Sequence, residues 1–401
     1  MTMIKKPVNG MRDILPAEMA VRNYAISLIR STYAEFGFSS IDTPAVEHIE
    51  NLLSKQGGEN EKLIFKILKR GEKLDLSQAT TEEAVTDSGL RYDLTLPLSR
   101  YYANHASELP SPFKALQIGS VWRADRPQRG RYRQFTQCDI DILGDPSCLA
   151  EIELILATTT ALSRLEFSNF TIRINDRRIL KSMAAKAGFE EKDYDKVFII
   201  LDKMDKIGMD GVRSELLESY PEEVVNAYLA QFDENADKAA LMEGSPLPQI
   251  ISTVDALKTA DFNVAFDPTL VRGMSYYTGP IFEIAMTEYG GSVGGGGRYD
   301  EMIGKFTGQP TPAVGFSIGF ERIIMLLMER GFRIPDEKEK VAFLVEKNMP
   351  ADKLTEVFRE AMAARAEGKA VGISIMKKNR KFQKDQLTAE GYAEIREFFR
   401  K

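Results

Sequence analysis

Two long strand-like segments separated by a short loop limit what this chain can fold into. The segments FKALQIGSVWRAD and YRQFTQCDIDILG span residues 113–125 and 132–144, and the loop between them contains Pro127 and Gly130. Proline and glycine are typical of tight turns. The pattern therefore predicts a β-hairpin, whose two strands run antiparallel and belong to one sheet.

The rest of the chain mixes helical and strand-like patterns. Apolar residues at helical spacing predict helices over 17–35 and 149–164, whereas residues 62–68 and 90–98 look like strands. Residues 177–260 are rich in Lys, Asp, Glu, Leu and Met with little strand pattern, so we expect a mainly helical insertion. Because strands do not alternate strictly with helices, a doubly wound parallel sheet is disfavoured and a mixed or antiparallel sheet is expected.

The end of the chain is set apart by the polar segment RIPDEKEK at 333–340, which we interpret as a linker. The tail then alternates strand-like and helix-like segments and predicts a small α/β domain over 337–401. Its charged end is expected to be helical, with no further strand.

Charge and composition narrow the functional class. The formal net charge is −6, which disfavours non-specific binding to nucleic acid and leaves room for a local basic surface. The only cysteines are Cys138 and Cys148, so a reducing cytoplasm fits best and a disulfide scaffold or cysteine-based zinc site is excluded. No segment is apolar enough to span a membrane or to serve as a signal peptide. The two histidines, His48 and His105, are far apart, which disfavours a Ser-His-Asp triad or a histidine metal site.

Five arginines are concentrated in and beside the hairpin loop, at positions 123, 126, 129, 131 and 133. Arginine binds phosphate bidentately, so this cluster could bind a triphosphate, an RNA end or both. On the second strand Phe135, Gln137, Asp139 and Asp141 are expected to share one face, and Phe135 could stack on a purine. The acids Asp125 and Asp141 would suit an amine or an imidazole N–H. The alternative is a solvated basic hairpin whose acids pair with its arginines.

Four successive glycines in YGGSVGGGGRYDEM, residues 289–302, would let the backbone approach a ligand closely. Neither the P-loop nor the dinucleotide fingerprint is present, so a flexible hairpin is the alternative. In LVRGMSYYTGPIFEI, residues 270–284, Arg272 could stabilise charge on a transferring group. Tyr276 and Tyr277 would point to opposite faces if extended, so only one is expected to line a pocket; an aromatic core strand is the alternative.

The segment AVGFSIGFERI, residues 313–323, predicts a strand followed by a helix. Its glycines admit close packing. Arg322 would lie in the first helical turn, where the helix dipole opposes a cation. This placement favours a ligand-binding role for Arg322.

Taken in order, these segments resemble the class II aminoacyl-tRNA synthetases and, within them, the histidyl-tRNA synthetases. The resemblance covers most of residues 8–330. It rests on NGMRDILP, on GFSSIDTPAVE with Pro44 as motif 1, on the arginine hairpin as motif 2, and on GFSIGFERI as motif 3. LVRGMSYYTG and GGGGRYD are similar to the histidine-specific signatures of that family.

The resemblance implies an α+β fold, with an antiparallel sheet of six or seven strands flanked by helices and a homodimer formed through motif 1. It implies a catalytic domain in two parts, residues 1–176 and 261–332, with the helical insertion at 177–260 between them. Residues 337–401 would be a shortened anticodon-binding α/β domain. The implied ligands are ATP, Mg²⁺, histidine and histidine tRNA, in the cytoplasm and without a membrane.

The resemblance also implies residue roles. The ATP-binding residues would be Arg123, Asp125, Arg131, Phe135 and Arg322. The histidine-binding residues would be Asp93, Thr95, Gln137, Asp141, Arg272, Tyr276 and Tyr277. Arg123 and Arg272 would be catalytic, because each would stabilise the α-phosphate during attack by the histidine carboxylate. Gln128, at the loop tip, would contact the extra 5′ guanosine of histidine tRNA.

Two departures from the family pattern keep alternatives open. Ser275 stands where the family usually has Asp, and only about 65 residues follow the linker, against roughly a hundred expected of a common domain size. The short tail favours a paralog that serves as regulatory subunit of ATP phosphoribosyltransferase. A ligase that charges a free amine or a carrier protein would also keep the ATP contacts. The presence of all four arginines, 123, 131, 272 and 322, favours the synthetase.

Overall fold

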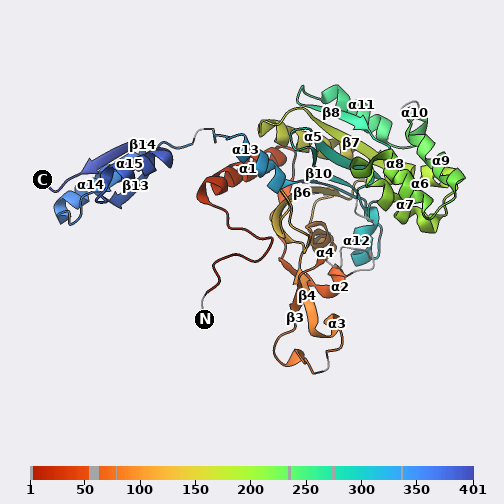
Figure 1. The fold of residues 1–401 in the computed structure, drawn as a ribbon, viewed down its shortest axis with the longest axis horizontal. Helices are drawn as coiled ribbons and strands as arrows, with labels where there is room; N and C mark the ends of the chain where they lie inside the picture. The colour runs from red at the N-terminus through yellow and green to blue at the C-terminus, as the bar shows by residue number, and fades with distance from the viewer. Residues whose placement is uncertain (1–2, 54–62, 78, 234–235, 273–275, 336) are drawn as a thin grey trace. The chain divides into compact units, whose positions relative to one another are not determined.

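The computed structural model describes residues 3–53, 63–77, 79–233, 236–272, 276–335 and 337–401. The chain divides into two compact units, one ending at Phe332 and the other running from Arg333 to Lys401. Figure 1 shows the elements of both units in chain order. The predicted site residues all belong to the first unit. Ser275, the departure noted in the sequence, lies outside the described residues.

The first unit is built on a sheet in which eight strands can be traced among the described residues, in the order β1-β5-β6-β11-β10-β9-β7-β8. The inner six are antiparallel, and each edge strand, β1 and β8, pairs in parallel with its neighbour. The expected antiparallel sheet is thus confirmed, with parallel edges. The strands are β1 Ser39–Ser40, β5 Phe113–Trp122, β6 Gln134–Leu143, β7 Phe170–Asp176, β8 Phe262–Phe266, β9 Pro280–Met286, β10 Gly291–Arg298 and β11 Ala313–Ile318.

Helices α1 (Pro16–Glu35), α5 (Leu149–Arg164) and α13 (Phe320–Glu329) pack on the sheet and on one another. The apolar face of α5 supplies buried residues at helical spacing, among them Leu154, Ile155, Ala161 and Leu162. Alternation along β6 buries Ile140 and Ile142 on the face away from Asp139 and Asp141. The helices therefore fill one face of the sheet, and the polar residues of β6 are left for the other.

The strand predicted over 90–98 is wrong. Strand β4 (Thr86–Leu90) ends where that strand should begin, and helix α4 follows over Thr95–His105. The side chain of Asp93 accepts a hydrogen bond from the backbone N–H of Leu96, which caps the helix start. Pro97 is tolerated because the N–H groups of a first helical turn have no partner inside the helix. Of the strand predicted over 62–68, β3 (Lys66–Leu68) forms, and it joins β4 and β2 (Val46–His48) in a small antiparallel sheet.

Between β7 and β8 the described chain is helical, as its composition indicates. The side chain of Asp176 accepts a hydrogen bond from the N–H of Arg178 and so starts the first of these helices. Figure 1 shows them gathered in green beside β7. They are α6 Arg177–Ala187, α7 Tyr194–Leu201, α8 Met204–Leu217, α9 Glu222–Leu229, α10 Lys238–Leu241 and α11 Leu247–Leu257.

The second unit is a three-stranded parallel sheet in the order β13-β12-β14, with two helices. The prediction that the chain ends in a helix without a further strand is wrong. Gly391, with a φ of 87°, follows α15, and the chain continues as β14, whose Phe398 stacks on Phe343 of β12 at 4.8 Å between ring centroids. The elements are β12 Lys340–Val345, α14 Ala351–Ala366, β13 Ala370–Ile375, α15 Arg380–Ala389 and β14 Tyr392–Phe398.

Candidate active site

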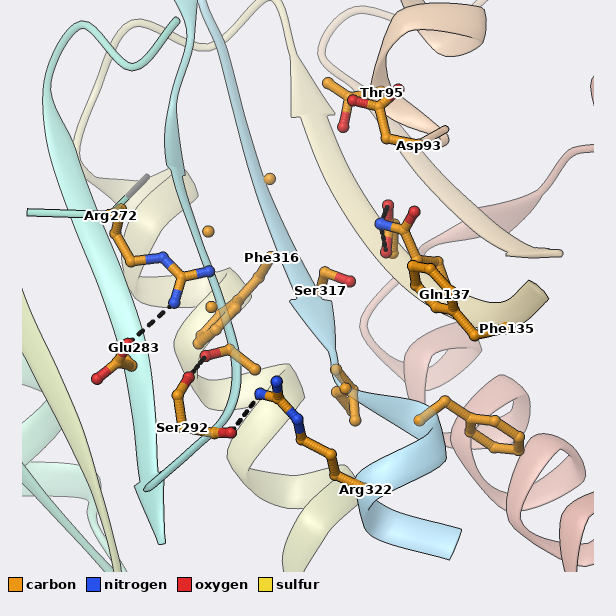
Figure 2. A pocket seen from close by; sticks show the side chains of 18 of the residues that line it. Asp93, Thr95, Phe135, Gln137, Arg272, Glu283, Ser292, Phe316, Ser317 and Arg322 are labelled. Carbon is orange, nitrogen blue, oxygen red and sulfur yellow. Dashed lines mark hydrogen bonds and ion pairs between the residues drawn. The ribbon is translucent and has the colours of Figure 1, made fainter. Parts of the chain in front are cut away.

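A cavity of about 480 Å³ opens over the centre of the large sheet. This volume falls within the range typical of ligand pockets. Its lining comes from the β5–β6 hairpin, from β10 and β11, from the start of α13, and from two loop segments beside Asp93 and Arg272. In Figure 2, Arg272 and Glu283 lie at one side of this cavity and Asp93 and Thr95 at the other.

The floor of the cavity is the glycine-rich strand β10, which forms an antiparallel hairpin with β9, so the hairpin alternative for residues 289–302 is confirmed in its topology, and the glycines line the cavity as well. A Cβ atom on Gly296 would lie 1.9 Å from the carbonyl oxygen of Gly315, and one on Gly295 would lie 2.6 Å from Cζ of Arg272. A Cβ on Gly315 itself would lie 2.0 Å from Oδ1 of Asp141. The glycines therefore let charged side chains lie directly against the sheet, where any larger residue would displace them.

Three buried carboxyl groups, those of Asp93, Asp139 and Asp141, cluster on the wall formed by β6 and the start of α4. Burial raises the pKa of all three, and burial together with the neighbouring charge of Asp93 raises the pKa of Asp139 to about 7. The hydroxyl of Tyr299 donates to Oδ1 of Asp141 at 2.6 Å. This wall is therefore suited to a ligand that brings positive charge or N–H donors.

Several buried polar atoms of the cavity have no hydrogen-bond partner among the residues that the structure describes. They are Oδ2 of Asp93, Oε1 of Gln137, Oδ2 of Asp141 and Nε of Arg272. A buried polar group without a partner costs roughly 1–3 kcal/mol, and native proteins rarely leave one unsatisfied. Their concentration in one cavity indicates a ligand that supplies acceptors at Arg272 and donors at the carboxylates.

The cavity is also lined by arginines, and the positive charge of Arg123 lies close enough to Asp93 and Asp139 to oppose part of the rise in their pKa. Nε of Arg123 donates to the carbonyl oxygen of Tyr92 at 2.9 Å, and its guanidinium lies over the ring of Phe135 at 5.1 Å. Arg322 donates to the carbonyl oxygen of Ser292, and burial, together with the charges of Arg131 and Arg272, lowers its pKa. The lowered pKa means that the charged form of Arg322 is disfavoured in the empty cavity. An anion bound there would favour the charged form and would be stabilised by it.

The structure brings the predicted small-molecule site residues together. Every one of these residues lines the cavity: Asp93, Thr95, Arg123, Asp125, Arg131, Phe135, Gln137, Asp141, Arg272, Tyr276, Tyr277 and Arg322. The expectation that only one of the two tyrosines would line a pocket is wrong. Residues 276–279 precede β9 and are not extended strand, and the two rings pack edge to face with centroids 4.8 Å apart.

The hairpin loop divides its arginines between two roles. Arg123 and Arg131 line the cavity, whereas Arg129 forms a salt bridge with Glu329 at 2.7 Å and Arg133 donates to the carbonyl oxygen of Asp125. The solvated-hairpin alternative thus describes Arg129 and fails for Arg123 and Arg131. Gln128 is exposed at the loop tip, where its backbone pairs with that of Arg131, and it does not line the cavity.

Among the lining residues to which sequence reasoning assigned no role are Asp139, Asp202, Glu283 and Tyr299. Asp139 could have been found, because it shares the strand face of Gln137 and Asp141. Tyr299 belongs to the GGGGRYD motif and was visible there. Asp202 follows α7 in the insertion, and no local pattern points from that helix to a cavity over the sheet.

The described residues contain no group of three or more His, Cys, Asp or Glu side chains placed to hold a metal ion. No helix in the described part of the chain has both the length and the apolar character needed to cross a bilayer.

Several known proteins similar to this chain belong to one family. The family model described as histidyl-tRNA synthetase matches residues 10–323. The chain is 43% identical to the histidine–tRNA ligase of Leifsonia xyli subsp. xyli, over 96% of this chain and 93% of that protein. It is 45% identical to the probable histidine–tRNA ligase of Tropheryma whipplei, over 80% of each.

A solved structure gives the same answer. The crystal structure of histidyl-tRNA synthetase from Nostoc sp. PCC 7120 superposes with a TM-score of 0.78 at 26% identity, covering 97% of this chain and 90% of that one. The family predicted from the motifs is confirmed: the chain belongs to the histidyl-tRNA synthetases, a family of class II aminoacyl-tRNA synthetases.

Proposed function

We propose that this chain is a histidine–tRNA ligase, which activates histidine with ATP to histidyl-adenylate and then transfers the histidyl group to the 3′ end of histidine tRNA. The observation that carries the proposal is that one cavity is lined both by a carboxylate wall and by an arginine part. Histidine offers an ammonium group and ring nitrogens to the first, and ATP offers phosphates to the second. The similarity to histidine–tRNA ligases supports the same substrates.

In the first step an oxygen of the histidine carboxylate attacks the α-phosphorus of ATP, and the bond to the pyrophosphate oxygen breaks. Both reactants are anionic, so the protein contributes cations and position more than proton transfer. Arg123 and Arg272 would stabilise the α-phosphate, and Arg131 and Arg322 the departing phosphates. By analogy with oxyanion-hole donors, loss of Arg123 or Arg272 should cost about 3 kcal/mol of transition-state stabilisation.

The adenine of ATP would stack on Phe135, with Asp125 near its amino group. On the carboxylate wall, Asp93, Thr95 and Gln137 would hold the α-ammonium group of histidine. Asp141, Tyr276 and Tyr277 would face the imidazole. A site that pairs both ring nitrogens would reject isosteres that leave its buried groups unpaired.

Magnesium would arrive with ATP. It binds through phosphate oxygens and water with few protein carboxylates, which fits a cavity whose described residues offer no three-ligand protein site. When bound, the ion would neutralise phosphate charge. A homodimer formed through the motif 1 segment and a cytoplasmic location complete the proposal.

The test is histidine-dependent exchange of pyrophosphate into ATP, followed by charging of histidine tRNA. Both should occur. Absence of exchange would contradict the ligase function and favour the regulatory paralog. Exchange without charging would favour a ligase with another acceptor.

A companion variant tests the loop tip. Gln128→Ala should weaken charging and leave exchange unchanged, because Gln128 is exposed and outside the cavity. Gln249→Ala, at an exposed position of α11, is the matched control and should change neither reaction. Equal loss of exchange and charging in the Gln128 variant would count against an RNA-facing loop tip.

A further inference from the structure

We propose that Glu283 and Arg173 are positioning residues that hold the guanidinium of Arg272 in its reactive orientation. The inference rests on the proposed function, because it assigns these residues to the adenylation step. Neither residue belongs to the predicted site, and Arg173 does not line the cavity.

The backbone of Arg272 adopts a conformation that is rare for a residue with a side chain. Its φ is +63°, a region that non-glycine residues occupy rarely and at a cost of order 1–3 kcal/mol. Nη1 of its guanidinium donates to Oε2 of Glu283 at 3.0 Å, whereas its Nε is buried and has no partner within the described part of the chain. Glu283 thus holds one edge of the guanidinium and leaves the other edge for a ligand, as Figure 2 shows.

The sheet limits the remaining freedom of this side chain. A Cβ atom on Gly295 would lie 2.6 Å from Cζ of Arg272, so the guanidinium rests directly on the glycine strand β10. Arg272 is therefore confined between the glycine floor and the carboxylate of Glu283. If that carboxylate were removed, the guanidinium would still rest on β10, but its direction would no longer be fixed.

Glu283 is itself fixed by Arg173. The two residues lie directly opposite each other on the paired strands β9 and β7, and such cross-strand pairs of opposite charge stabilise a sheet. Nη1 of Arg173 donates to Oε1 of Glu283 at 3.1 Å, so the two oxygens of Glu283 serve two different arginines. Both side chains are largely buried, with exposures of 19% for Arg173 and 14% for Glu283.

Arg173 is held from the other side by Asp267, which follows β8, and by Asp205 of α8. The contact with Asp205 contributes little, because that carboxylate is 70% exposed and solvent screens the pair. The chain of support therefore runs from Asp267 through Arg173 and Glu283 to Arg272. Without Arg173, Glu283 would pair with Arg272 alone. The carboxylate of Glu283 would then draw the guanidinium of Arg272 away from the α-phosphate of ATP.

A positioning role predicts a loss in kcat with little change in KM. In pyrophosphate exchange, Glu283→Gln and Arg173→Gln should lower kcat at least tenfold, with the KM for ATP and for histidine within about threefold of wild type. Arg173→Lys should recover part of the lost kcat, because a lysine can still pair with Glu283. Arg164→Gln, which removes a pair with Glu35 between α5 and α1, is the matched control and should leave kcat unchanged.

The outcomes separate this inference from the proposed function. If wild type catalyses exchange and folded Glu283→Gln has an unchanged kcat, the inference is overturned and the proposed function stands. The same holds if Arg173→Lys has a kcat no higher than that of Arg173→Gln. A rise in both KM values that accounts for the whole loss would also overturn it. Absence of exchange in wild type would overturn the function together with the inference. If Glu283→Gln does not fold, the two Arg173 variants decide by their kcat values.

Discussion

Replacing Gly315 with alanine tests how the glycine floor shapes the histidine end of the cavity. Gly315 lies opposite Asp141 in the β11–β6 pair, and an added Cβ would lie 2.0 Å from Oδ1 and 3.0 Å from Cγ of that aspartate. The next atom in reach is a ring carbon of Tyr299 at 3.3 Å, with no backbone atom among the three nearest. The methyl group should therefore displace the Asp141 carboxylate and break its hydrogen bond from Tyr299.

The expected loss of histidine affinity follows from the loss of the hydrogen bond between the displaced Asp141 carboxylate and the imidazole. A hydrogen bond that involves a charged group contributes about 1.5–3 kcal/mol, and about 1.4 kcal/mol corresponds to a tenfold change in affinity. Gly315→Ala should thus weaken histidine binding by about tenfold to a hundredfold. The KM for ATP should stay within about twofold, because the arginine part of the cavity is untouched. Pyrophosphate exchange with either substrate varied measures both constants.

Gly291→Ala is the matched control. It places a methyl group on the sheet at β10, where the nearest atom is in ordinary contact at 3.8 Å, and Gly291 does not line the cavity. Its kinetic constants should equal those of wild type. If Gly315→Ala leaves the KM for histidine unchanged, or raises the KM for ATP equally while the protein remains folded, Asp141 does not hold the imidazole.

Two further predictions concern protons and stability. Because burial and the charge of Asp93 raise the pKa of Asp139 to about 7, the protein should lose stability as pH rises from the ordinary range of an aspartate up to about 7, and an ammonium ligand should reverse that loss. Histidine binding to wild type should therefore release protons near pH 7, and binding to Asp139→Asn should release fewer. Calorimetry in two buffers measures the number released, and equal numbers for the two proteins would contradict the prediction. Arg22→Leu removes the 2.7 Å partner of the buried Glu321, which keeps Arg12 at 3.4 Å, and should cost about 3 kcal/mol, the lower end of the range for a broken buried pair. Arg164→Gln, at an exposed pair, should cost less than about 1 kcal/mol in thermal unfolding, and similar losses in both would refute the distinction.

The parts of this fold that sequence could predict are those governed by local periodicity. The hairpin of β5 and β6 was visible because its loop is short and its strands are long, and alternation then placed Phe135, Gln137 and Asp141 on one face. The segment 90–98 was not predictable in the same way. Its apolar residues suit either a strand or a helix, and the cap from Asp93 to Leu96 decided between them.

Tertiary contacts account for what the sequence could not show. Glu283 contacts Arg173, which is 110 positions away, and no local pattern links the two. Asp202 lines the cavity from the insertion, although its neighbours in sequence form an ordinary amphipathic helix. The glycine run at 294–297 gave no periodic signal, because glycine has no side chain to alternate. Its strand is defined by its partners β9 and β11.

The charges of the cavity explain why its empty form is costly and its occupied form is favoured. Each carboxyl group on the wall is held near others of its own kind, and burial raises the pKa of Asp139 and Asp141. The arginines face one another in the same way, since the charges of Arg131 and Arg272 contribute to the lowered pKa of Arg322. A ligand pair with ammonium at one end and phosphate at the other relieves both repulsions at once. Histidine and ATP should therefore each raise the thermal stability of the first unit, and the two together should raise it further than either alone; a protein stabilised by neither ligand would contradict this account.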